Sequence, residues 1–286
     1  MRPRVPLSQS QRQQRQRVLA YLFIAVVMVV FIAPSVWMVL GSIQPNREIT
    51  KDTPNFIPRN VTLANYERIA TEPQFRTYFQ NSLITTSATV LLSLVISIHA
   101  GYAFSRYRFV GKRLLMTGIL SVQMFPKVAI LITLFAFFAR LELINTYEGL
   151  VLSHLSLTLP FSVWFMKAFI DSIPFELEEA ALIDGAGRLR SIWQVVVPLC
   201  LPGIVSVAVY TFMLSWNDFV FALTLMSQDD MRTLPVGVNL SYIGQFQNDW
   251  SGMMALSTVA SLPVVIMFIL LQRFMIAGLT AGALKA

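Results

Sequence analysis

Three long stretches of this sequence are apolar and carry no charged side chain: residues 18–40, 82–105 and 251–272. A helix needs about 20 apolar residues to cross the hydrocarbon core of a bilayer, and each stretch is long enough. Only 13% of the 286 residues are charged, about half the proportion usual in a soluble domain. The chain therefore has too little polar surface for a soluble enzyme, and it is too apolar for a disordered or collagen-like protein. We predict an integral membrane protein.

Three further apolar stretches contain one charged residue each. Lys127 lies in residues 114–139, Lys167 lies near the end of residues 149–170, and Asp218 lies in residues 201–226. The apolar runs are continuous, whereas strands of a membrane barrel would alternate. Several of the stretches contain proline, which a packed helical bundle tolerates. The sequence predicts an all-α bundle of six membrane-spanning helices.

Basic residues predict the orientation of the bundle, because lysine and arginine are enriched in cytoplasmic loops. If the N-terminus is cytoplasmic, most of the 22 lysines and arginines fall on the cytoplasmic side. We therefore expect a basic cytoplasmic N-terminus at residues 1–17, a transmembrane domain at residues 18–286, and a cytoplasmic C-terminus. The first span is too long for a cleaved signal peptide and lacks a cleavage site. The net charge of +7 then reflects topology and gives no support to nucleic-acid binding.

The segment between the fourth and fifth spans, residues 171–198, has the pattern of two short helices. Pro174 suits a first helical position, and Gly185 and Gly187 are typical of a helix end. Residues 188–197 predict a second short helix. The first turn contains acidic residues that complement the helix dipole: Glu176, Glu178 and Glu179. Spacing alone supports two interpretations equally, a connecting loop with a solvated acidic face and a docking element for a cytoplasmic partner.

The residues of this segment resemble the EAA motif of ABC importer permeases. Glu179-Ala180-Ala181 is followed by Gly185 and then by Val195-Val196-Val197-Pro198, where the family more often has Ile-x-Leu-Pro. Residues 179–186 resemble the carbohydrate branch of the family, in particular maltose-type permeases with six spans. Similar segments extend along nearly the whole chain: residues 81–82, 124–126, 216–219 and 278–285.

The resemblance implies a transport subunit that is not itself an enzyme. In such permeases the EAA helices sit in a cleft on the ATPase subunits, and ATP-driven closure of the ATPase dimer moves the bundle. The resemblance implies that the following residues couple to the ATPase: Glu178, Glu179, Ala180, Ala181, Asp184, Gly185, Ala186 and Pro198. The chain has no GxxxxGK[ST] phosphate-binding string, so ATP and Mg would be used by a separate ATPase and this chain would hold no cofactor. The implied partners are a second, different permease, two ATPase subunits and an extracytoplasmic sugar-binding protein.

Two charged residues lie inside predicted spans. Lys127 and Asp218 each cost about 2.5–3.5 kcal/mol on insertion scales if unpaired. Their predicted depths agree within about one helical turn, so they either form a structural ion pair or line a water-filled path. Trp216 and Asn217 beside Asp218 suit a sugar, since indole stacks on a ring face and amide and carboxylate groups bind hydroxyls. We expect Lys127, Trp216, Asn217 and Asp218 to line the substrate path, and we expect no metal site.

The sequence thus predicts the permease subunit of an ATP-driven carbohydrate importer in the plasma or inner membrane of a bacterium or archaeon. One alternative is a stand-alone secondary transporter, a class that often shows two related halves. Another is an intramembrane enzyme, for which Lys127 and Asp218 are the only candidate pair. The sequence is compatible with maltodextrin, trehalose, a glycosylated polyol or glycerol phosphate as the substrate.

Overall fold

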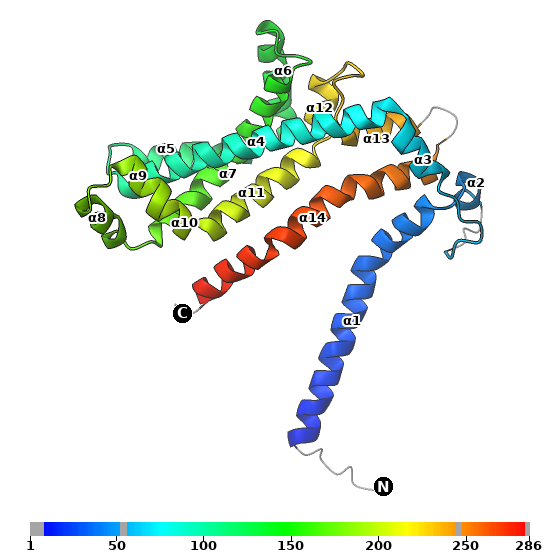
Figure 1. The fold of residues 1–286 in the computed structure, drawn as a ribbon, viewed down its shortest axis with the longest axis horizontal. Helices are drawn as coiled ribbons and strands as arrows, with labels where there is room; N and C mark the ends of the chain where they lie inside the picture. Colours follow the sequence, from blue (N-terminus) through cyan, green and yellow to red (C-terminus); the bar gives the residue numbers. More distant parts are fainter. Residues whose placement is uncertain (1–8, 52–55, 244–247, 284–286) are drawn as a thin grey trace. The chain divides into compact units, whose positions relative to one another are not determined.

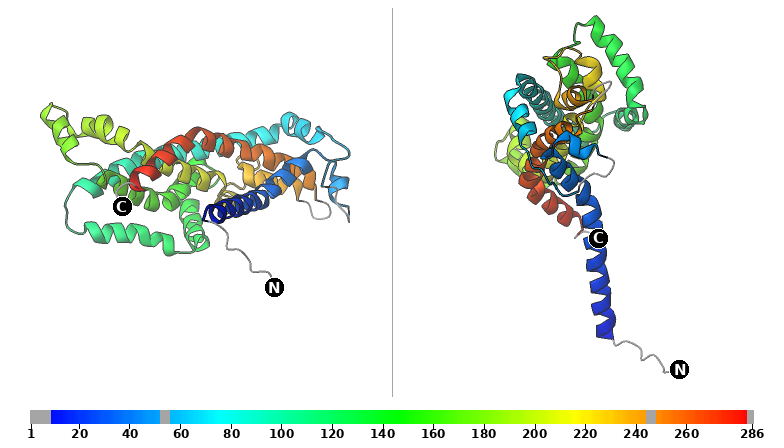
Figure 2. Two further views of the ribbon diagram at one scale, coloured as in Figure 1. Left: turned by 90° about the horizontal axis from the view of Figure 1, so that it is seen from below. Right: turned by 90° about the vertical axis from the view of Figure 1, so that its right-hand side faces the viewer.

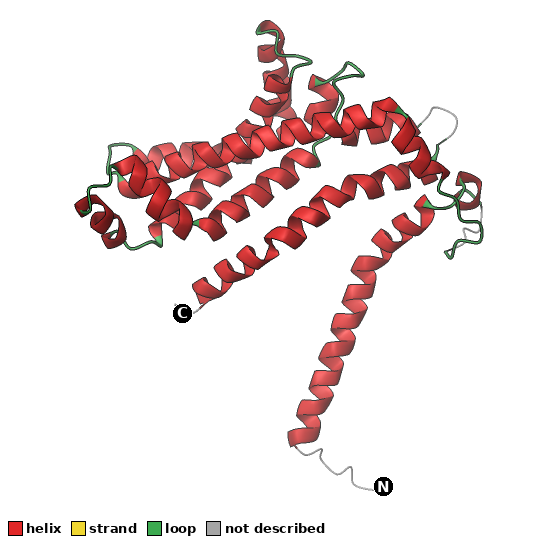
Figure 3. Cartoon of the chain, in the orientation of Figure 1, coloured by secondary structure: helices red, strands yellow, loops and turns green. Residues whose placement is uncertain are grey.

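The described part of the chain is helical (Figure 3). The computed structural model describes residues 9–51, 56–243 and 248–283, and it describes side-chain environments for residues 13–274 within those ranges. Residues 1–8 of the predicted basic N-terminus and residues 284–286 of the tail lie outside the described residues. The chain divides into two compact units, residues 1–68 with 242–259 and residues 69–241 with 260–286.

The first unit contains the first predicted span. Its elements are α1 (Gln9–Ser42), α2 (Asn46–Ile49), most of α3 (Ala64–Thr71) and the beginning of α14 (Trp250–Ala283). The Ser42 hydroxyl lies 2.6 Å from the Tyr66 hydroxyl, and Asn46 Nδ2 donates to the backbone oxygen of Asn248 at 2.9 Å. These contacts hold the unit together at one end of α1. No residue in the most apolar window of α1 is buried, as expected of a helix that faces lipid or another subunit.

Three helices form the core of the second unit and lie side by side (Figures 1 and 2): α4 (Pro73–Arg106), α7 (Tyr147–Asp171) and α11 (Leu201–Trp216). A Cβ atom on Gly101 would lie 2.9 Å from Met166 Cβ, so α4 and α7 approach closely because one side chain is missing. Ser93 Oγ lies 3.3 Å from both Ser162 Oγ and Thr211 Oγ1. Small and hydroxylated residues at such interfaces are typical of membrane helix packing.

The third predicted span, residues 114–139, is broken. It comprises α5 (Lys112–Ser121), the 3-10 turn η1 (Val122–Met124) and α6 (Lys127–Arg140), and the two helical parts meet at 101°. Figure 1 shows α6 turned away from the direction of α5. Phe125 is extended, as the residue before a proline prefers, and Pro126 cannot donate a backbone hydrogen bond. The one proline therefore ends one helix and starts the next.

The fifth predicted span, residues 201–226, is also interrupted. α11 ends at Trp216, and the short helix α12 (Val220–Leu225) follows after three residues. Among the described residues, four helices are long and apolar enough to cross a membrane, and counting each bent helix pair as one span gives up to six spans. The all-α membrane architecture is confirmed, and the structure corrects the prediction that residues 114–139 and 201–226 are unbroken helices.

The start of α4 holds the segment that leads to α13 (Leu234–Tyr242). Asn81 Nδ2 donates to the backbone oxygens of Asp230 at 2.8 Å and Arg232 at 2.9 Å. The Ser82 hydroxyl accepts a 2.8 Å hydrogen bond from the backbone N–H of Leu234. Both side chains are buried. The Asn-Ser pair at residues 81–82 therefore satisfies the backbone groups of a loop where it packs against the bundle.

Candidate functional site

The loop between α7 and α11 forms two short helices, α8 (Glu176–Ile183) and α9 (Arg188–Ser191), which project from one end of the second unit (Figures 1 and 2). Gly185 ends α8 in the left-handed region, with φ of 84°. The backbone N–H of Ala186 returns to the Ala181 oxygen at 2.9 Å, which closes the helix end. A Cβ atom on Gly185 would meet nothing within 4 Å. Backbone conformation, not space within this chain, therefore requires glycine here.

Glu178 faces into the protein. Its side chain is 1% exposed; Oε2 accepts a 2.9 Å hydrogen bond from the Tyr102 hydroxyl, and Oε1 accepts one of 2.7 Å from Arg106 Nε. Arg106 Nη2 also donates to the Ile173 backbone oxygen at 2.9 Å. Tyr102 and Arg106 are four residues apart and share one face of α4. The sequence predicts that Glu178 couples to the ATPase; its carboxylate faces inward and ties α8 to the end of α4, and the coupling role stays a prediction.

The other predicted coupling residues lie toward the outside of the loop. Five of them are exposed: Glu179, Ala180, Asp184, Gly185 and Pro198. The other two, Ala181 and Ala186, are half-buried. Among contacts between described residues, the Glu179 carboxylate has no hydrogen bond or ion pair. The same two helices also expose large apolar side chains that sequence reasoning missed, above all Ile183 at 85% and Leu189 at 66%. Exposed apolar groups beside acidic ones are typical of a protein-binding surface.

A widened helical turn joins this loop to α11. Residues Ile192–Val196 form a short π-helix, and α10 (Val197–Leu199) follows it. Pro198 lacks the N–H group that would bond into the preceding turn, and turns of this kind occur often at functional sites. Ile192 and Val196 are buried in the core cluster that also contains Met166 of α7. The run Arg188–Leu199 then meets α11 at 80°, so the loop is anchored both to α4 and to α11.

Asp218 contacts His154 and not Lys127. Its Oδ2 lies 3.3 Å from His154 Nε2 and accepts a 2.9 Å hydrogen bond from the backbone N–H of Ala222, which caps the start of α12. His154 Nδ1 lies 2.7 Å from the Ser215 hydroxyl. Lys127 is exposed at the first position of α6, because the bend at Pro126 places it there. The ion pair between Lys127 and Asp218 that depth suggested is not formed.

Trp216 is a packing residue. Its side chain is 3% exposed, its ring stacks on Phe212 with centroids 5.4 Å apart, and Phe79 meets it edge-on at 5.8 Å. The indole Nε1 donates to the Ala260 backbone oxygen at 3.0 Å. The ring is therefore covered by neighbouring side chains of the described chain, and this packing gives no support to the predicted stacking on a sugar. The residue instead fixes the point where α11 ends.

Two of the predicted substrate-path residues remain accessible. Asn217 is exposed, and its Nδ2 donates to the Met213 backbone oxygen at 2.8 Å. Lys127 lies at a cavity of about 250 Å³ whose lining also includes Gln123, Ser156 and Tyr210. A cation, an amide and hydroxyl groups can bind the oxygens of a polyol. Within the described residues, no group of three or more His, Cys, Asp or Glu side chains is arranged to hold a metal ion.

Because Lys127 and Asp218 do not touch, their substitutions should act independently. We expect Asp218→Ala to lower the melting temperature of the purified protein, since it removes the α12 cap, worth about 1 kcal/mol. Lys127→Ala should change the melting temperature little. In the double variant the two shifts should add, as distant sites do. If the double variant loses much less melting temperature than the two single variants together, Lys127 and Asp218 interact directly and this assignment is wrong.

The known proteins that this chain resembles are membrane components of transport systems. Residues 93–280 match the family described as binding-protein-dependent transport system inner membrane component. The chain is 34% identical over 272 residues to a trehalose/maltose transport system permease protein of Thermococcus litoralis, covering 94% of this chain and 97% of that protein. It is 36% identical to an inner membrane ABC transporter permease protein of Escherichia coli, covering 93% and 95%. A sulfoquinovosyl glycerol transport system permease protein of Agrobacterium fabrum is 33% identical, with 93% of each chain covered.

The fold is also found among solved structures. A bacterial ABC transporter involved in the import of the acidic polysaccharide alginate has a chain that superposes with a TM-score of 0.80 at 21% identity, covering 94% of this chain and 99% of that one. A second alginate transporter structure, in complex with a periplasmic protein bound to an alginate pentasaccharide, gives a TM-score of 0.63 at 14% identity and covers 92% of this chain and 93% of that one. At these identities the likeness shows a shared fold.

Proposed function

This chain belongs to the family of binding-protein-dependent transport system inner membrane components, and we infer from that membership that it is the permease subunit of an ABC importer for a carbohydrate. The observation that carries the inference is 33–36% identity across more than nine-tenths of the chain to relatives that include named sugar permeases. It is a multi-pass membrane protein and a transport subunit, and a separate subunit hydrolyses ATP. A stand-alone secondary transporter is not supported.

The partners follow from the family. An importer of this kind works with a substrate-binding protein and an ATPase. We propose in addition that the assembly contains a second, different permease and two ATPase subunits that use ATP and Mg. We place both termini and the α8–α9 loop in the cytoplasm, which the distribution of lysine and arginine supports. The transmembrane domain would extend over residues 18–286, with the coupling loop at residues 171–198.

The α8–α9 loop has the properties needed to couple the ATPase to the bundle. Its outer side combines the exposed Glu179 with Ala180, whose side chain is a methyl group, and Gly185, which has none, so that a partner can approach closely. Its inner side is tied to α4 by Glu178 and Arg106. A displacement of α8 by the ATPase would therefore be passed to α4 and, through the turn before α11, to the fifth span. We propose this as the path by which ATP hydrolysis drives transport.

The substrate path is proposed at the broken spans. Lys127 at its cavity and Asn217 at the end of α11 offer exposed polar groups. Trp216 and Asp218 stabilise the break between α11 and α12 through the packing and hydrogen bonds described above. We propose that the substrate is an oligosaccharide, a disaccharide or a related polyol glycoside. The relatives named for trehalose or maltose and for sulfoquinovosyl glycerol support the carbohydrate class.

Reconstitution tests the function directly. The chain is co-expressed with its second permease and ATPase, placed in vesicles and supplied with the binding protein, whose sugar is first identified by a thermal-shift screen. We expect uptake of that sugar only with ATP inside the vesicle, and none with an ATPase whose phosphate-binding lysine is replaced. Equal uptake by vesicles that lack the ATPase would instead establish a secondary transporter.

A further inference from the structure

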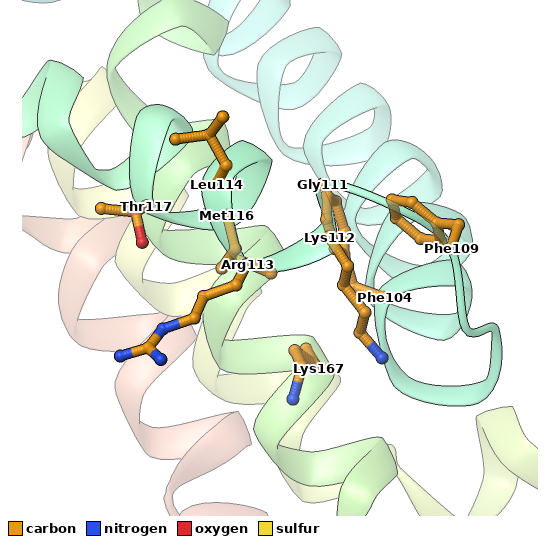
Figure 4. A pocket seen from close by; sticks show the side chains of 9 residues that line it. All are labelled: Phe104, Phe109, Gly111, Lys112, Arg113, Leu114, Met116, Thr117 and Lys167. Carbon is orange, nitrogen blue, oxygen red and sulfur yellow. The ribbon is translucent and has the colours of Figure 1, made fainter.

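A large cavity lies at one end of the second unit, where α4 ends and α5 begins (Figure 4). Its volume is about 880 Å³, within the range of small-molecule sites. The walls combine two chemistries. The apolar part includes Phe104, Leu114 and Met116, and the cationic part is Lys112, Arg113 and Lys167.

The cavity carries an excess of positive charge. No acidic residue is among those that line it. Lys167 is paired with Asp171. Lys112 Nζ donates to the backbone oxygens of Ser105 at 3.4 Å and Tyr107 at 3.1 Å, and Lys112 also interacts electrostatically with Asp171. Among contacts between described residues, the Arg113 guanidinium has neither a hydrogen bond nor an ion pair, and the residue is exposed. Three cations at one cavity therefore share the single carboxylate of Asp171, and positive charge is in excess.

The position of the cavity along the spans indicates what surrounds it. α4 ends at Arg106, α5 begins at Lys112, and Lys167 lies one turn before the end of α7. These helix ends place the cavity at the depth where hydrocarbon gives way to headgroups. The neighbouring Val110 and Leu114 are exposed to 101% and 76%. Apolar walls beside an excess of positive charge at that depth match a lipid with an acyl chain and an anionic headgroup.

We propose that this cavity binds an anionic phospholipid such as phosphatidylglycerol. The phosphate would lie against Arg113 and Lys112, whose N–H groups form charge-assisted hydrogen bonds to phosphate oxygens. An acyl chain would cover Phe104, Leu114 and Met116. The site is separate from the α8–α9 coupling surface and from the proposed substrate path, and the proposal holds whatever sugar is transported.

Native mass spectrometry of the purified transporter complex tests the site. The complex is titrated with phosphatidylglycerol, with phosphatidylcholine as the neutral probe. We expect tighter retention of phosphatidylglycerol by the unmodified protein, and about fivefold weaker retention by Arg113→Gln, from about 1 kcal/mol per basic residue near an anionic lipid. Arg113→Lys should retain most of the affinity, because it keeps the charge.

The controls separate this site from general charge effects and from other occupants. Arg108→Gln removes an exposed cation at the same end of the unit but outside the cavity lining, so it should leave retention unchanged. The melting temperature of Arg113→Gln should equal that of the unmodified complex, since Arg113 makes no polar contact within the described chain.

Three results of the retention measurements would overturn the proposal. They are equal retention of both lipids, equal retention by the unmodified protein and Arg113→Gln, and displacement of the lipid by millimolar inorganic phosphate, which would indicate a site for a soluble anion. A photo-reactive phosphatidylglycerol should label residues 104–117. Exclusive crosslinking of this segment to another subunit would show instead that a protein covers the cavity.

Discussion

Gly185→Trp should abolish sugar uptake by the assembled transporter while leaving this chain folded in the membrane. A Cβ atom at this position meets no atom within 4 Å in this chain, and Gly185 is exposed, so we expect a bulky side chain here to point into solvent. Its internal cost is the left-handed backbone at φ of 84°, about 1–2 kcal/mol. If the ATPase cleft covers α8, however, an indole ring there blocks the approach. Uptake into vesicles and the ATPase activity of the complex measure the effect.

Gly185→Asn separates backbone strain from blocked docking. Asparagine tolerates the left-handed region better than other residues, and its side chain is small. We expect this variant to keep a substantial part of the uptake, at least tenfold more than Gly185→Trp, with a similar melting temperature. If both variants lose uptake equally, strain at the turn is the cause. If Gly185→Trp transports normally, the α8–α9 loop is not the docking element.

The apolar pattern of the sequence predicted the helical membrane architecture because burial in lipid leaves a strong signal in every span. It did not predict where spans break. Pro126 lay inside a continuous apolar run, and prolines also occur within unbroken helices such as α7, which contains Pro160. Whether a proline only loosens a helix or bends the chain sharply depends on what packs beside it. The break at residues 217–219 likewise depends on Asp218 capping the next helix, an interaction that spacing does not reveal.

The candidate site, too, could be predicted from the sequence only in part. The end of α8 at Gly185 was predictable, because only glycine enters the left-handed region readily. The partner of Asp218 was not, because His154 is distant in the sequence and depth arguments selected the residue with the opposite formal charge. Trp216 suited a sugar by residue type, but its stacking on Phe212 and Phe79 arises only from tertiary packing. The sequence therefore predicts where the backbone needs a particular residue type, but it does not predict which side chains from different helices contact each other.

Glu178 and Glu179 are adjacent and chemically identical, yet their substitution should have different consequences. Successive residues on a helix point about 100° apart, and this rotation places Glu178 against Arg106 while Glu179 remains exposed. Glu178→Ala leaves Arg106, whose side chain is only 12% exposed, without its carboxylate partner, and such a loss in a buried pair typically costs about 3–5 kcal/mol. We expect a marked fall in melting temperature together with loss of uptake.

Glu179→Ala is the matched control. It should leave the melting temperature unchanged, because Glu179 makes no polar contact within the described chain, but it should weaken binding of the ATPase to the permease in detergent and lower uptake. Replacing both members of the buried pair, Glu178→Leu with Arg106→Met, should recover much of the stability, as apolar substitution of buried ion pairs often does.

That double variant should nevertheless transport poorly if the ion pair carries motion from α8 to α4. Its ATPase activity should persist without the matching sugar uptake, which is the signature of uncoupling. Full recovery of uptake along with stability would limit the pair to a folding role. Equal destabilisation by Glu178→Ala and Glu179→Ala would contradict the inward orientation of Glu178, on which this assignment of the two glutamates depends.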